Sequence, residues 1–98
     1  MMSGQYTDGS YIGDATDAFF GIVQVKAVVQ DGKLTDIQLL QFPNDHETTI
    51  QISNRAFPLL TQEAIAVQSA EVDIISGATE SSVGFKQSLA SALAQAKN

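Results

Sequence analysis

The sequence contains no cysteine, one histidine and few basic residues. The lack of cysteine excludes disulfides, thiolate zinc sites, iron–sulfur clusters and thiol catalysis. Five basic residues stand against eleven acidic ones, and the net charge of −6 argues against binding to nucleic acid or anionic lipid. No apolar run approaches the ~20 residues of a membrane span, and residues 1–10 lack the pattern of a signal peptide.

What is present predicts one small folded domain. The chain has 98 residues, of which 44% are hydrophobic and 16% charged, and these values argue against disorder. One domain is therefore expected over residues 1–98, in which residues 1–5 are flexible or are not a native part of the domain. The chain itself is expected to be soluble, with membrane contact only through a parent protein or complex.

Hydrophobic periodicity predicts an α+β fold, in which a small antiparallel sheet packs against two main helices. Pro58 suits the first turn of a helix, so anything helical before it should be a separate turn. The expected elements are an edge strand at 6–12, a polar loop at 13–17, strands at 19–29 and 33–42, a helix at 58–68, a strand at 72–75 and a helix from 80 onward.

The hairpin between the two long strands has two readings. A two-residue loop at Asp31 and Gly32 would place Asp36 opposite Ala27 on the apolar face. A three-residue loop at 30–32 avoids this conflict and gives Gly32 a positive φ, so it is the predicted one. It pairs Val25 with Ile37, Val23 with Leu39 and Lys26 with Asp36.

The residues offer little acid–base or metal chemistry. His46 lies in a loop between Asp45 and Glu47, without the second histidine or regular ligand spacing of a metal site. No serine lies in a nucleophile elbow, and no pair of carboxylates stands out. We therefore predict no catalytic residue and no metal site.

The segment SGATESS, residues 76–82, has two readings. A hydroxyl can cap the following helix, and Glu80 suits the helix dipole. Small residues at the joint also let another molecule approach the backbone, and the amides of a helix start favour an anion such as phosphate. The residues alone leave both readings open.

The segment DIISGAT, residues 73–79, resembles the D-x-x-[ST]-G-A-T motif of the FMN-binding domain family. YTDGSYIG at 6–13 resembles the family's Y-x-D-G-x-Y-x-G start, and VQVKAVVQDGKLTDI at 23–37 resembles its hairpin. HET at 46–48 and QSAEVD at 68–73 also resemble family segments. The family includes a subunit of the sodium-pumping NADH:quinone oxidoreductase.

This resemblance implies FMN as cofactor, joined by a phosphoester bond to Thr79. A flavin transferase makes that bond, with FAD as donor and magnesium. Glu80 departs from the small or apolar residue of many relatives, and its carboxylate should weaken noncovalent FMN binding. The other cofactor-binding residues predicted from the resemblance are Asp73, Ser76, Gly77, Ala78, Ser81, Ser82, His46, Glu47 and Thr48.

The resemblance further implies an electron carrier that passes electrons between partner redox domains or subunits and is not a complete enzyme. Reversible FMN binding, or an apo interaction module, is the alternative. A flavin reductase would require a nucleotide site, and no G-x-G-x-x-G is present. The expected location is the extracytoplasmic face of a bacterial membrane through a parent protein, or otherwise the cytoplasm.

Overall fold

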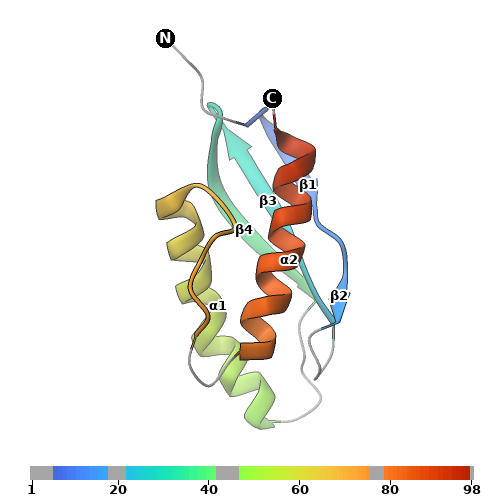
Figure 1. Cartoon of the computed structure of the whole chain (residues 1–98), viewed down its shortest axis with the longest axis vertical. Helices are drawn as coiled ribbons and strands as arrows, with labels where there is room; N and C mark the ends of the chain where they lie inside the picture. The colour runs from blue at the N-terminus through green and yellow to red at the C-terminus, as the bar shows by residue number, and fades with distance from the viewer. Residues whose placement is uncertain (1–5, 18–21, 42–46, 76–78, 98) are drawn as a thin grey trace.

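The computed structural model describes residues 6–17, 22–41, 47–75 and 79–97, except for the side chains of 47–54, 80 and 81. In this part of the chain an antiparallel sheet packs against two helices, so the predicted α+β class is confirmed (Figure 1). The elements are β1 (Gly9–Ile12), β2 (Thr16–Asp17), β3 (Ile22–Gln30), β4 (Lys33–Gln41), α1 (Glu47–Val67) and α2 (Thr79–Ala96).

The central strand β3 pairs with β4 on one side and with both β1 and β2 on the other. β1 and β2 are two parts of one interrupted edge, because Ile12 lies opposite Lys26 and Thr16 lies opposite Val23. The predicted loop at 13–17 therefore contains a short strand. Between the two parts, Gly13 still donates its N–H to the carbonyl of Val25 (2.9 Å).

The hairpin between β3 and β4 has a two-residue turn, so the predicted three-residue loop at 30–32 is wrong. Gln30 pairs with Lys33, and the turn consists of Asp31 and Gly32. Their φ values are 54° and 76°, and two successive positive values suit a type I′ turn. The predicted positive φ of Gly32 is confirmed.

A β-bulge resolves the conflict that a two-residue turn creates. Thr35 is an extra residue on β4, so Asp36 pairs with Val28 and Ile37 pairs with Ala27. The carboxylate of Asp36 is thereby exposed while Ile37 is buried. The other predicted pairs are corrected as well: Leu39 lies opposite Val25 and not Val23, and Lys26 lies opposite Gln38 and not Asp36.

Gly32→Val is expected to lower the free energy of unfolding by about 1 kcal/mol or more, because a β-branched residue is strained at positive φ. Urea denaturation measures the loss. Gly32→Asn is the control, since asparagine tolerates this conformation better. A valine variant as stable as the asparagine variant would contradict the argument.

Helix α1 continues through Pro58, so the predicted break before Pro58 is wrong. Proline removes one helical hydrogen bond and typically costs about 3 kcal/mol inside a helix. Pro58 is exposed, so its ring lies on the side of α1 that faces the solvent and not in the core. Phe57 and Leu60 are buried on either side of it, and their burial, at about 1.5–3 kcal/mol each, offsets the loss.

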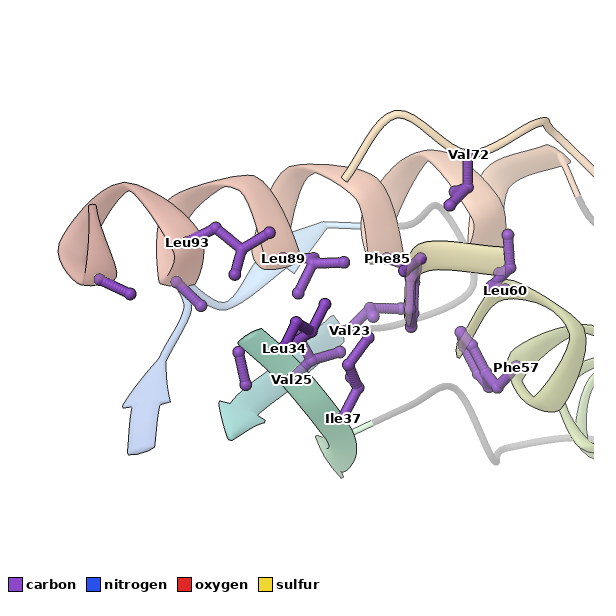
Figure 2. Packing of buried hydrophobic residues seen from close by; sticks show 14 of the residues in the cluster. Val23, Val25, Leu34, Ile37, Phe57, Leu60, Val72, Phe85, Leu89 and Leu93 are labelled. Atoms are coloured by element: carbon purple, nitrogen blue, oxygen red, sulfur yellow. The ribbon is translucent and has the colours of Figure 1, made fainter. Parts of the chain in front are cut away.

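The core lies between the sheet and the two helices, which cover the same face (Figures 1 and 2). The rings of Phe57 on α1 and Phe85 on α2 lie 6.1 Å apart and join the helices. The predicted apolar stripes of β3 and α2 are confirmed, except for Phe19, which lies outside the described residues. The buried residues of these two stripes are Val23, Val25, Ala27, Val29, Phe85, Leu89, Ala92 and Leu93. On α1, Leu60 and Ala64 are buried as predicted, but Val67 is 50% exposed, so its predicted place on that stripe is wrong.

The N-terminal motif has a structural role at the hairpin end of the sheet. Asp8 accepts a hydrogen bond from the N–H of Gly32 through Oδ1 (2.8 Å) and so holds the turn. The hydroxyl of the buried Tyr6 donates to the carbonyl of Gln68 (2.7 Å) at the end of α1. These contacts tie the start of the chain to the hairpin and to α1.

Gln68 joins α1 to the sheet edge. Its φ of 58° ends the helix in the left-handed region. The side-chain amide meets both backbone groups of Leu34 at 2.8 Å, with Oε1 accepting from N–H and Nε2 donating to the carbonyl. Gln68 therefore occupies the hydrogen-bonding groups of β4 as another strand would.

Candidate functional site

The predicted acceptor Thr79 is the first residue of α2, one residue earlier than the predicted helix start. Its side chain is exposed. The helix that follows has 18 residues, and its N–H groups and dipole give the start a partial positive charge. This end of the helix therefore combines an accessible hydroxyl with groups that stabilise an anion.

Both helices start at the same end of the molecule, where β3 begins and β4 ends (Figure 1). Glu47 and Thr48 are the first two residues of α1, so the fold brings their backbone to the end that carries Thr79. Their side chains lie outside the described part, as does the whole of His46. The predicted contacts of these three side chains with the cofactor stay predictions.

The segment before the motif is not a strand, so the predicted strand at 72–75 is wrong. Val72 is buried in the core, yet the segment pairs with no described strand. Side chains of the helices bind its alternate amides instead. Asp73 donates its N–H to Oε1 of Glu63 on α1 (3.2 Å), and Ile75 donates its N–H to Oγ of Ser82 on α2 (3.0 Å).

The predicted ligand residues differ in where the structure places them. The Asp73 side chain is exposed, whereas Ser82 is 0% exposed and its hydroxyl binds the Ile75 amide. Ser81 lies in the first turn of α2, but its side chain is outside the described part. Ser76, Gly77 and Ala78 also lie outside the described residues, so their contacts with a cofactor stay predictions.

Two apolar side chains that were not predicted as site residues are exposed on the first turns of α2 and on the segment that Ser82 binds. Val83 follows Thr79 by four residues on the same face of α2 and is 39% exposed. Ile74 is 40% exposed on the segment that Ser82 holds against the helix start. The available signal for Val83 was its position off the buried stripe of α2.

Strand β2 is fixed to the same part of α2. The hydroxyl of Thr16 lies 2.9 Å from the carbonyl of Gly84 and 3.0 Å from that of Val23. It can donate to either of them and so bridges helix and sheet. The first turns of α2 are thus held both by β2 and by the segment at 72–75 that follows α1.

Neither helix, over the residues described, is both long and apolar enough to cross a membrane. The described side chains also include no group of three or more His, Asp or Glu that could hold a metal ion.

Comparison with known proteins gives the family. A model of the FMN-binding domain matches residues 19–94. The crystal structure of the CPE2226 protein from Clostridium perfringens is similar, with a TM-score of 0.75 and 24% sequence identity over 93% of this chain and 88% of that chain. At this identity the likeness shows the fold alone. No curated protein matches significantly.

The chain thus belongs to the FMN-binding domain family, and FMN is its cofactor. The helix start fits this cofactor. Its amides suit a phosphate, and Thr79 has an accessible hydroxyl beside them. Val83, one turn after Thr79 on α2, and Ile74, on the segment that leads to the helix start, offer exposed apolar surface that suits a flat aromatic ring.

Proposed function

We propose that this domain is an electron carrier whose FMN is attached through a phosphoester bond to Thr79. The observation that carries the proposal is the position of Thr79, which is exposed at the first residue of an 18-residue helix. A threonine buried in the core would be inaccessible to a transferase. The resemblance of residues 73–79 to the family motif points to the same residue, and the match to the FMN-binding domain supports FMN as the cofactor.

The attachment reaction is a phosphoryl transfer. The Thr79 oxygen forms a bond to the phosphorus on the FMN side of FAD, the bond between the two phosphates of FAD breaks, and AMP leaves. The hydroxyl proton is released. Magnesium and the transferase stabilise the negative charge on the phosphate of the departing AMP. On this chain, the amides at the start of α2 stabilise the resulting phosphodiester anion.

FMN supplies the redox chemistry when bound, accepting and passing one or two electrons. The residues of this chain position the cofactor and exclude water from part of it. Val83 and Ile74 provide the exposed apolar surface for that role. No side chain needs to act as an acid or base, so the domain is a carrier within a larger redox system.

The proposed partners are a flavin transferase and the redox domains or subunits on either side of the carrier. The net charge of −6 favours partners with a positive surface and disfavours nucleic acid. Membrane contact, in this proposal, occurs only through a parent protein or complex. The domain would then lie on the extracytoplasmic face of a bacterial membrane, or in the cytoplasm if its parent protein is cytoplasmic.

Incubation with a flavin transferase, FAD and magnesium tests the proposal. The wild-type chain is expected to gain the mass of FMN less one water and to remain yellow after denaturation and gel filtration. A chain of unchanged mass that releases all flavin on denaturation would instead identify a reversible FMN-binding module. Sustained oxidation of NADH with a dye by the isolated domain would identify a reductase.

A further inference from the structure

Among the described side chains of α2, two serines are fully buried and each binds a backbone N–H from another part of the chain. Ser82 and Ser88 are both 0% exposed, and the Oγ atom of each accepts one backbone N–H at 3.0 Å. The partner of Ser88 is Val25 in the middle of β3, whereas the partner of Ser82 is Ile75. Ser88 therefore fixes the helix on the sheet, while Ser82 fixes the chain that leads into the helix.

The Ser82 contact connects the two sides of the joint before Thr79. Ser82 lies three residues after Thr79, on the first turn of α2, and Ile75 lies four residues before it. The bond between them closes a short loop that contains Thr79. Because the end turns of helices fray readily, a link of this kind limits the positions that Thr79 can adopt.

The preceding residues are held independently of Ser82. Val72 is buried, and the Asp73 N–H binds Glu63 of α1 (3.2 Å). Loss of the Ser82 contact would therefore leave the segment anchored up to Asp73 and release it only beyond that residue. The part that would lose its anchor begins at Ile74 and leads directly to Thr79.

We propose that Ser82 is a positioning residue for flavin attachment, and that it acts through the backbone of Ile75 rather than by binding the cofactor. The hydrogen bond holds the Thr79 hydroxyl in the orientation that attack on phosphorus requires. This inference rests on the proposed function of Thr79. It differs from the expectation that the Ser82 hydroxyl contacts FMN, because that hydroxyl is buried and already accepts a hydrogen bond.

The test compares Ser82→Ala with Ser88→Ala, since both variants delete a buried hydroxyl from α2 and leave one backbone N–H without its acceptor. Initial rates of attachment are measured by intact mass with transferase, FAD and magnesium, at a temperature where all variants are folded. Ser82→Ala is expected to lower kcat at least about tenfold with little change in KM for the domain, because small misplacements reduce rates strongly. Ser88→Ala should stay within about twofold of wild type, because its bond does not bear on Thr79.

A second readout needs no flavin. Amide hydrogen exchange in the apo protein should show lost protection at Ile75 in Ser82→Ala and at Val25 in Ser88→Ala. If Ser82→Ala does not fold, Ser82→Cys takes its place, because the somewhat larger thiol leaves no cavity and sulfur is a weaker acceptor than oxygen. Its attachment rate should lie well below that of wild type, with Ile75 partly deprotected.

The possible results separate this inference from the function on which it rests. Equal attachment rates in Ser82→Ala, Ser88→Ala and wild type, with label on Thr79, would overturn the role of Ser82 alone. Unchanged protection of Ile75 in Ser82→Ala would overturn it as well. A wild-type chain that takes no label, or takes it elsewhere than Thr79, would overturn both proposals.

Discussion

Gly13→Ala is expected to lower the free energy of unfolding by about 3 kcal/mol, a value at the upper end for inserting a methyl group into packed structure. A Cβ atom at Gly13 would lie 1.9 Å from the backbone oxygen of Ser88 and 2.8 Å from its Oγ. No rotamer change removes the first clash, since the contacted atom belongs to the backbone of α2. Either α2 or the connection between β1 and β2, in which Gly13 lies, has to move.

Neither element can move without losing hydrogen bonds. The carbonyl of Gly13 accepts from Nε2 of Gln24 (3.0 Å), its N–H donates to Val25 (2.9 Å), and the next N–H, that of Asp14, donates to Oγ of Ser91 on α2 (2.9 Å). A displaced connection between β1 and β2 would weaken all three. This is why the expected loss exceeds that of an ordinary added methyl group.

Urea denaturation followed by circular dichroism measures the loss for Gly13→Ala. Ser10→Ala is the control, because Ser10 is an exposed residue of the neighbouring β1 and its truncation should change stability by no more than about 0.5 kcal/mol. If Gly13→Ala is as stable as Ser10→Ala, the close approach between α2 and the connection from β1 to β2 is not rigid.

The sequence predicted the elements whose side chains repeat regularly. The alternation of β3 and the stripe of α2 from Phe85 to Leu93 are both buried as expected. Each pattern extends over several residues, so one face of the element is apolar whatever its neighbours are. The positive φ of Gly32 also followed from local turn chemistry.

Features that depend on tertiary contacts were not predicted. The bulge at Thr35 shifts the register after the turn, and only the packed sheet determines that Asp36 stays outside. Pro58 remains inside a helix because burial on both sides outweighs a lost hydrogen bond. The segment at 72–75 looks like a strand because Val72 is buried, but helix side chains bind its amides instead of a neighbouring strand.

In the candidate site, too, local features could be predicted from the sequence and features set by tertiary contacts could not. The motif placed Thr79 at a helix start, and the structure has it there, exposed. The role of Ser82 could not be read from the motif, because a serine in the first turn of a helix can equally face a ligand or the core. Its burial depends on how the segment from α1 passes across α2.

Thr79→Ala is expected to abolish covalent flavin attachment and to leave the domain folded. The substitution removes the only atom that can form the phosphoester at this position. Because the side chain is exposed, its truncation creates no cavity, and the loss of stability should not exceed the ~1 kcal/mol of a helix cap. Intact mass, colour after denaturation and urea denaturation measure the three quantities.

Thr79→Ser distinguishes an acceptor from a cap. Serine caps helices as well as threonine does, so a cap predicts unchanged stability and no flavin on any variant. An acceptor predicts partial labelling of the serine variant, because the loss of the methyl group frees the χ1 angle and the hydroxyl is oriented less strictly. Full labelling of Thr79→Ala would place the bond at another residue. Flavin that binds wild type and Thr79→Ala equally, and leaves both on denaturation, would show that this domain holds FMN reversibly.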